Sequence, residues 1–164
     1  MKHAVERLAV WTALAGGGVL VALVVLTCVS IAGRALTGVG LGPIPGDYEL
    51  VEIGIGFAVF AALPWCHLNR GHATVELFAP VFGPRLNRVL DAVIDLAVLA
   101  TALLLTWRLA VGMLDKKAYF ETTFILEIQI WQAYALGLVG AAVFCLIALW
   151  KAGDSVWRIA GGRS

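Results

Sequence analysis

Residues 8–33 read LAVWTALAGGGVLVALVVLTCVSIAG and contain no Asp, Glu, Lys or Arg. An α-helix needs about 20 apolar residues to cross the hydrocarbon core of a bilayer, so this run is long enough to span a membrane. Three further apolar runs follow at residues 50–68, 89–114 and 133–150, and most charged residues lie between the runs. The sequence therefore predicts an all-α integral membrane protein with four transmembrane helices.

The composition agrees with a chain that consists mainly of membrane spans. Of its 164 residues, 61% are hydrophobic and 14% are charged, whereas soluble domains carry about 25% charged residues. The mean hydropathy is +0.91. We therefore expect residues 1–164 to form a single four-helix transmembrane domain. The net charge of +1 indicates no nucleic-acid partner, because such a partner requires a clustered basic surface.

The distribution of Lys and Arg predicts how the spans are oriented, because cytoplasmic loops are enriched in these residues. Eight of them lie on the side that holds both termini and four on the other side. The eight are Lys2, Arg7, Arg70, Arg85, Arg88, Lys151, Arg158 and Arg163, and the four are Arg34, Arg108, Lys116 and Lys117. We therefore expect both termini in the cytoplasm.

The connection between the second and third spans contains residues 72–82, which mix polar and apolar side chains. This segment is too short to span, and Pro80 and Pro84 restrict it to short helical pieces. We predict a short amphipathic segment that lies in the cytoplasmic headgroup region of the membrane lipid.

Charged residues gather where the first span ends and the second begins. Asp47 is a good N-cap for the second span, because its carboxylate can accept a backbone N–H. Glu49 and Glu52 are three residues apart and therefore share a helix face. Carboxylates at a membrane edge need a counter-charge, and Arg34 is the nearest candidate. We expect an Arg–Glu clamp between the first two spans or a contact with a partner, and an ion or proton site is the alternative.

Asp95 lies about two helical turns inside the third span, on the stripe that also carries Arg88 and Asp91. An acid at this depth is costly when it faces lipid, so Asp95 should face protein or water. It is the residue that we single out as a candidate functional acid. The structural alternative is a polar cap at the cytoplasmic end of the helices.

The sequence offers little for chemistry or for a cofactor. Cys66, His67 and His72 suggest a metal site, but the two histidines are five residues apart and no second cluster completes a tetrahedral set. No nucleophile elbow, P-loop or dinucleotide fingerprint occurs. We expect no cofactor and no enzymatic activity. The almost wholly apolar middle of each span favours an accessory subunit over a carrier that works alone.

The last span and the loop before it show two packing features. Gly137 and Gly140 lie in a run of small residues, which allows a neighbouring helix to approach closely. The loop from Asp115 to Trp131 is more apolar than a free loop, so we expect it to pack on the outer rim or against another protein.

The chain resembles the small membrane subunit of tripartite ATP-independent periplasmic (TRAP) transporters. The resemblance begins with Arg34 at the end of the first span and continues with PGDYELVE at residues 45–52. It includes RGHATVE at residues 70–76, which contains Arg70 and His72. Family members often have a proline shortly before the last span, whereas residues 127–131 here read EIQIW.

The resemblance implies a function and two protein partners. Such subunits pair with a large permease subunit that holds the substrate and sodium sites. A periplasmic binding protein delivers a carboxylate, and the sodium gradient drives uptake across the bacterial inner membrane. The small subunit is expected to act as a fixed scaffold.

Mapped onto this chain, the resemblance also suggests partner contacts. The helix face with Gly137 and Gly140 is a candidate contact for the large subunit. The acidic rim of Asp47, Glu49 and Glu52 is a candidate for guiding the binding protein. The structural or partner-interface candidates are Arg34, Asp47, Glu49, Glu52, Arg70, His72, Asp95, Gly137 and Gly140.

Two alternatives from other classes remain open. One is a four-helix membrane redox subunit that binds haem or quinone, which would need paired histidines across the helices. The other is an independent small carrier that uses Asp95 as its proton site.

Overall fold

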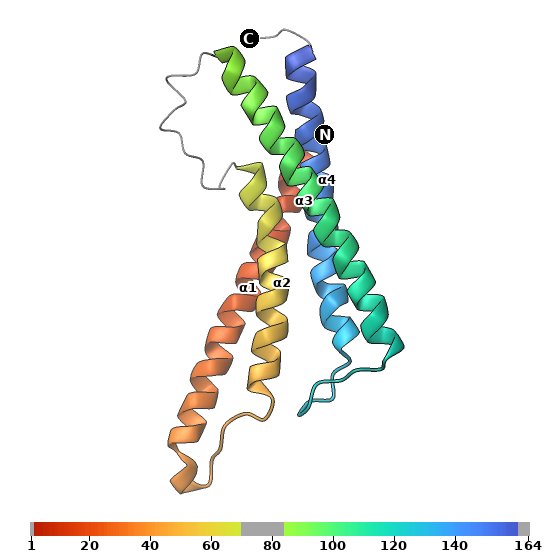
Figure 1. Cartoon of the computed structure of the whole chain (residues 1–164). Helices are drawn as coiled ribbons and strands as arrows, with labels where there is room; N and C mark the ends of the chain where they lie inside the picture. Colours follow the sequence, from red (N-terminus) through yellow and green to blue (C-terminus); the bar gives the residue numbers. More distant parts are fainter. Residues whose placement is uncertain (1, 70–83, 161–164) are drawn as a thin grey trace.

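Four long helices dominate the computed structural model, which describes residues 2–69 and 84–160. They are α1 (Lys2–Ala35), α2 (Asp47–Leu68), α3 (Pro84–Ala118) and α4 (Ile130–Ala160), with a short 3₁₀ helix η1 (Thr37–Val39) after α1. The described residues form no strand beyond an isolated bridge between Thr122 and Gln129. Each long helix is long and apolar enough to cross a membrane (Figure 1). The predicted all-α protein with four spans is therefore confirmed.

The helices extend beyond the apolar runs that predicted them. For example, α4 continues from the end of its run at residue 150 to Ala160, through a segment that contains Lys151 and Asp154. Helical hydrogen bonding does not stop where apolar residues stop, so hydropathy places the spans but not the helix ends. The predicted interfacial segment at residues 72–82 lies outside the described residues, as do Arg70 and His72.

The start of α2 differs by one residue from the prediction. Gly46, rather than Asp47, is the N-cap, and its φ of 74° favours glycine. The Gly46 carbonyl accepts the Leu50 N–H at 3.2 Å. Asp47 is the first helical residue, and its Oδ1 accepts the Tyr48 N–H at 2.8 Å. The carboxylate therefore still accepts a backbone N–H in the first turn, although Asp47 is not the cap.

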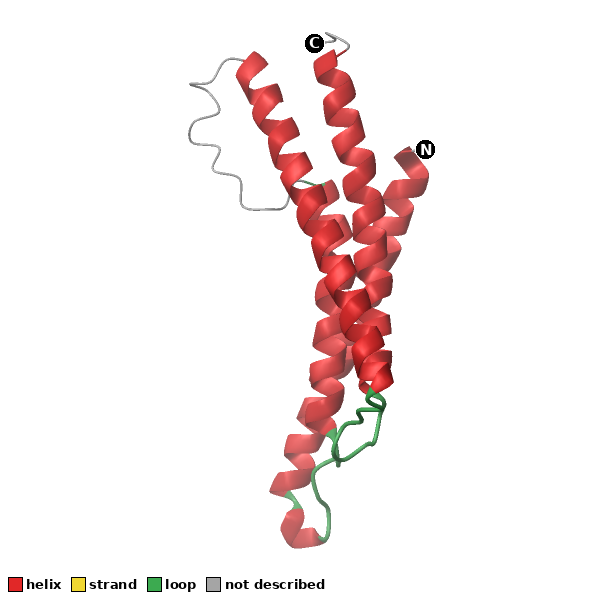
Figure 2. Cartoon of the chain, turned by 45° about the vertical axis from the view of Figure 1, so that its right-hand side comes forward, coloured by secondary structure: helices red, strands yellow, loops and turns green. Residues whose placement is uncertain are grey.

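The four helices form two antiparallel hairpins, α1–α2 and α3–α4, which meet mainly where α2 packs against α4. Within the described part of the chain, the backbone of α3 does not approach α1 or α2 closely, so the spatial order is α1–α2–α4–α3. Figures 1 and 2 show both chain termini toward the same end of the molecule, which we call the terminal end. We call the opposite end, where residues 36–46 and 119–129 connect the helices, the loop end. Figure 1 shows the hairpins spreading apart toward it.

Small residues determine how closely the helices approach one another. A Cβ added to Gly16 of α1 would lie 3.0 Å from the Ala61 Cβ and 3.2 Å from the Ala58 carbonyl oxygen of α2. A Cβ added to Gly140 of α4 would lie 2.8 Å from the carbonyl carbon of Phe60 in α2. Close approach of backbones through such residues is a general way to join membrane helices.

The predicted close approach at Gly137 and Gly140 is thus observed, with α2 as the neighbour, and contact of this face with the large subunit stays a prediction. Both glycines are buried, and both contact Phe60 of α2. At Gly140, α2 therefore covers this face of α4, whereas Gly137 also lines a cleft between the two helices. The sequence shows that a helix can approach these glycines, but it does not show which helix does so.

Most large apolar side chains point away from the helix contacts. The buried core consists mainly of small residues, and one cluster joins Ala102 of α3 with Phe144 and Ala148 of α4. In contrast, residues such as Val21, Val93 and Leu149 are more than half exposed. Lipid tails are as apolar as these side chains, so their exposure is compatible with a membrane and leaves broad apolar faces on the array.

Candidate functional site

A buried polar cluster joins α2, α3 and α4 toward the terminal end, and we call it the terminal cluster. It contains Asp95 of α3, Lys151 and Ser155 of α4, and His67 of α2. The Ser155 hydroxyl donates a hydrogen bond to Asp95 Oδ2. The Lys151 Nζ lies 3.9 Å from Asp95 Oδ1 and donates to the His67 carbonyl at 2.5 Å. Asp95 is only 4% exposed, so it faces protein, as predicted.

Local helix geometry explains the cluster. Lys151 and Ser155 are four residues apart on α4, so both side chains point to the same face. His67 lies in the last turn of α2, where carbonyl groups have no partner within the helix. The Lys151 ammonium donates a hydrogen bond to one of these carbonyl groups. Its positive charge is also attracted to the negative end of the α2 helix dipole. The His67 ring packs edge-on against Phe144, with the ring centroids 5.9 Å apart.

The cluster holds three helices together and balances the charge of Asp95 inside the chain. A buried acid with a lysine and a hydroxyl as partners favours a structural role over proton transfer, although the role itself is still a prediction. Sequence reasoning used Lys151 only to predict orientation and missed Ser155. The positions of Asp95 and Lys151 in the sequence could have predicted that they pair, because both lie near the ends of their apolar runs on the side of the chain termini.

At the loop end, α1 is joined to α2 through Asp47 rather than Glu52. The buried Ser30 of α1 donates its hydroxyl hydrogen to Asp47 Oδ2, and its oxygen accepts the Ile44 N–H at 3.3 Å. Arg34 is exposed and attracts the Asp47 carboxylate electrostatically. In the described chain, no ion pair forms between Arg34 and Glu52.

The predicted Arg34–Glu52 clamp is therefore wrong, for a geometric reason. Successive residues of an α-helix are rotated by about 100°, so Glu52 is turned about 140° from Asp47 around the axis of α2. When Asp47 faces α1, Glu52 faces a different side of the helix. Glu52 instead lies on the side of α2 that faces α4.

Glu49 joins α2 to the connection between α3 and α4. Its two carboxylate oxygens accept the N–H groups of Ile125 and Leu126 at 2.8 and 3.0 Å. The connection is itself ordered, because the Thr123 N–H donates to the Ile128 carbonyl at 2.9 Å and the Ile128 N–H donates to Thr123 Oγ1 at 3.1 Å. The apolar loop predicted to pack on the rim therefore rests on the first turn of α2.

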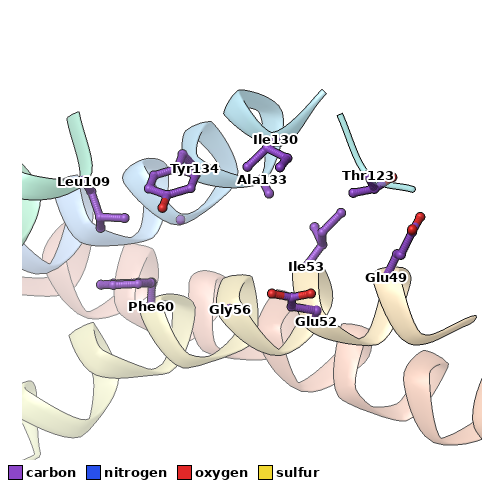
Figure 3. Close-up of a pocket in the computed structure, with 11 residues that line it drawn as sticks. Glu49, Glu52, Ile53, Gly56, Phe60, Leu109, Thr123, Ile130, Ala133 and Tyr134 are labelled. Carbon is purple, nitrogen blue, oxygen red and sulfur yellow. The ribbon is translucent and has the colours of Figure 1, made fainter. Parts of the chain in front are cut away.

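A cleft of about 240 Å³ lies between α2 and α4 beside this connection, and we call it the loop-end cleft (Figure 3). Glu49 and Glu52 both line it, so the prediction that they share a helix face is confirmed. The Glu52 carboxylate forms no hydrogen bond or ion pair with the described residues. The lining residues are Glu49, Glu52, Ile53, Gly56, Phe60, Leu109, Thr123, Ile130, Ala133, Tyr134 and Gly137.

The chemistry of the cleft suits a cationic group better than an anion. Its walls are mostly apolar, and its two charged side chains are both carboxylates. Pockets for small molecules usually enclose about 300–1,000 Å³, so this cleft is small for a free solute. A carboxylate substrate would also be repelled by Glu52. The cleft is therefore not a site for an organic acid.

The metal hypothesis gains no support from the described residues. Among them, no three His, Cys, Asp or Glu side chains gather closely enough to hold an ion. Cys66 and His67 are consecutive on α2 and point in different directions, and His72 lies outside the described residues. The cysteines Cys28, Cys66 and Cys145 are not joined in disulfides.

Comparison with protein families identifies the chain. The family model for tripartite ATP-independent periplasmic transporters, DctQ component, matches residues 23–156, which is more than half of the sequence. A search of curated proteins finds no match. The matched family is a transporter component rather than an enzyme family, and the four spanning helices indicate a multi-pass membrane protein. The chain therefore belongs to the DctQ component family, the small permease subunits of tripartite ATP-independent periplasmic transporters.

Proposed function

We propose that this chain is the fixed scaffold subunit of its transporter. In this role it supports a large permease subunit that takes up an organic acid, driven by the sodium gradient, after a periplasmic binding protein delivers the acid. The proposal places the chain in a bacterial inner membrane with both termini in the cytoplasm and treats it as one four-helix domain.

The family match carries this proposal, and the distribution of polar groups supports it. In the described chain, the buried polar side chains are Ser30, His67 and Asp95. Ser30 is bonded to Asp47 toward the loop end, whereas His67 and Asp95 belong to the terminal cluster. The helix contacts between these positions are mostly apolar, with Gly140 against Phe60, and the hydroxyl of Thr106 is hydrogen-bonded to α4 at Cys145. Such an interior offers no polar route for an anionic solute.

The way the helices are joined supports a rigid role. Close contacts at Gly16 and Gly140 hold α2 against both α1 and α4. Polar links bind the helices at both ends, through Asp47 and Glu49 at the loop end and Asp95 at the terminal end. An array fixed in this way, with broad apolar faces, suits a static support beside which a partner moves.

Neither alternative gains a specific observation in its favour. An independent proton carrier would need Asp95 to exchange protons with both sides, but Asp95 is buried against Ser155 and Lys151. A haem subunit would need two facing histidines. In the described chain, His3 is exposed near the start of α1 and His67 packs against Phe144 in the terminal cluster.

Reconstitution in liposomes tests the proposal. The binding protein is first screened against organic acids by thermal shift, and the acid that stabilises it is used as labelled substrate. Uptake is then measured with all three proteins, with each one omitted, and with the sodium gradient abolished. We expect uptake only when all three proteins and the gradient are present. Uptake by this chain alone, or full uptake without it, would contradict the scaffold role.

A further inference from the structure

Glu52 lies at a membrane depth where a carboxylate requires a partner. The 22 residues of α2 extend about 33 Å, close to the ~30 Å thickness of the hydrocarbon core. Glu52 is five residues from the start of α2, or about 8 Å along the axis, and therefore lies just inside the hydrocarbon edge. Charged side chains at such positions pair with one another or face a water-filled cavity. Glu52 has no cation within the described chain.

The loop-end cleft is shaped to receive a side chain from the plane of the membrane. Glu49 accepts hydrogen bonds from Ile125 and Leu126, and these bonds hold the α3–α4 connection against the first turn of α2. Thr123 of this connection lines the cleft beside the two glutamates (Figure 3). The connection therefore covers the cleft on its headgroup side, and access is from between α2 and α4.

The floor of the cleft leaves room for a neighbouring helix. A Cβ added to Gly56 would meet no atom within 4 Å, so the space above this residue is open. Ala133 of α4 is also a small residue of the lining, and small residues allow another membrane helix to approach. Phe60 and Tyr134 supply the apolar walls along which a long aliphatic stem could pack.

We propose that the loop-end cleft receives an Arg or Lys side chain from an apolar transmembrane helix of the large permease subunit, and that Glu52 is its counter-ion. This inference rests on the proposed function, which supplies the membrane partner. The charge of the cleft selects a cation, and its volume is below the usual range for a free solute. Both carboxylate oxygens of Glu49 accept loop N–H groups, which leaves Glu52 as the open charge.

A bound metal cation or a lipid amine fits less well. Hard cations take six or more oxygen ligands, and the cleft offers one open carboxylate with few other oxygens. An amine on a lipid headgroup would have to reach Glu52 from the side that the connection covers. Lys and Arg carry their charge on long stems, so they can reach this depth from a neighbouring helix.

Association of the two membrane subunits tests the inference. The tagged small subunit and the large permease are incorporated into nanodiscs of phosphatidylcholine and phosphatidylglycerol, because neither of these lipid headgroups carries a primary amine. Three variants are compared with the natural chain: Glu52→Gln, Glu52→Arg and the control Asp115→Asn. Asp115 is also an exposed acid near the loop end but does not line the cleft.

We expect Glu52→Gln to weaken association by about 10-fold, the loss typical of one charged hydrogen bond. Glu52→Arg should weaken it further, because it places two cations together. Replacing one Arg or Lys of the permease by Glu should restore association with Glu52→Arg. Asp115→Asn should bind as the natural chain does.

Three results would overturn the inference. Unchanged association of Glu52→Gln would show that Glu52 has no role in the contact. An effect of Glu52→Gln that appears only after phosphatidylethanolamine is added would identify a lipid amine as the occupant. Failure of every single permease substitution to rescue Glu52→Arg would exclude a direct pair. If the natural chain does not bind the permease at all, the proposed function itself fails.

Discussion

Asp95 and Glu52 are both acids within membrane-spanning helices, but the chain treats them differently. Asp95 is buried where α2, α3 and α4 meet, and Ser155 and Lys151 of α4 satisfy its carboxylate. Glu52 lines an open cleft between α2 and α4 and has no polar partner in the described chain. The chain therefore completes its polar contacts at the terminal end and leaves one incomplete at the loop end.

The arrangement of the two hairpins accounts for this difference. In Figure 1 the hairpins are close together toward the terminal end and spread apart toward the loop end. Where helices are close, a side chain from one can neutralise an acid on another. Where they spread, the residues of α3 and α4 that line the cleft with Glu52 carry no positive charge, and a partner is needed. A charge within a membrane-spanning helix is thus evidence of function here only when the chain itself does not neutralise it.

The largest effect should come from breaking the pair at the terminal end. Lys151→Met would leave Asp95 buried without its cation, and removal of one member of a buried pair typically costs about 3–5 kcal/mol. We expect a large fall in the thermal unfolding midpoint in detergent. The double variant Asp95→Asn with Lys151→Met removes both charges and should recover most of the loss. Equal stability of Lys151→Met and the natural chain would show that the pair does not hold the helices.

A smaller effect is expected from the helix contact that lies between the two regions. Gly140→Ala would place a methyl group 2.8 Å from the Phe60 backbone and force α2 away from α4. Overpacking of this kind costs about 1–3 kcal/mol. The matched control is Gly17→Ala on α1, where a Cβ meets no atom within 4 Å. Thermal unfolding of both variants measures the difference, and equal midpoints would contradict the close contact.

At the loop end, Glu49→Ala should loosen the α3–α4 connection without unfolding the helices. It removes the acceptor for the Ile125 and Leu126 N–H groups, which then exchange with solvent more easily. Hydrogen–deuterium exchange should be several-fold faster across residues 119–129 and unchanged in α1. Asp115→Asn serves as control. Unchanged exchange would mean that Glu49 does not hold the connection, and the cleft would lose its cover.

The smallest effect is expected for Glu52→Gln in the isolated chain. Because no described side chain pairs with Glu52, the free energy of unfolding should change by no more than about 0.5 kcal/mol. Thermal unfolding of the purified subunit measures this change, beside Lys151→Met as the positive control. A marked loss of stability would show that Glu52 has a partner within the chain and would remove the contrast with Asp95.

Several features of the fold and the site could be predicted from local sequence. The four apolar runs predicted four helices, and the spacing of Glu49 and Glu52 placed both on one face of α2. The depth of Asp95 predicted that it faces protein, and the small residues around Gly140 predicted close packing. Each of these inferences depends on residues of one helix and on the regular geometry of that helix.

The errors concern pairs of helices. Arg34 was assigned to Glu52, but Ser30 bonds Asp47 instead, because the rotation of α2 about its axis decides which acid faces α1. The small residues around Gly137 and Gly140 predict that a helix approaches closely, but they do not show that this helix is α2. Lys151 and Ser155 were not connected with Asp95, because the relative heights of α3 and α4 cannot be read from either helix alone.

The sequence by itself determined the class of protein, the number of long helices and the apolar segments from which they are built. These follow from hydropathy and helix periodicity, which are properties of short segments. Only the tertiary structure decided the order α1–α2–α4–α3, the neutralisation of Asp95 and the open position of Glu52. The reason is physical: in a chain whose helix surfaces are almost uniformly apolar, many arrangements bury similar area, and a few glycine contacts and polar links select one.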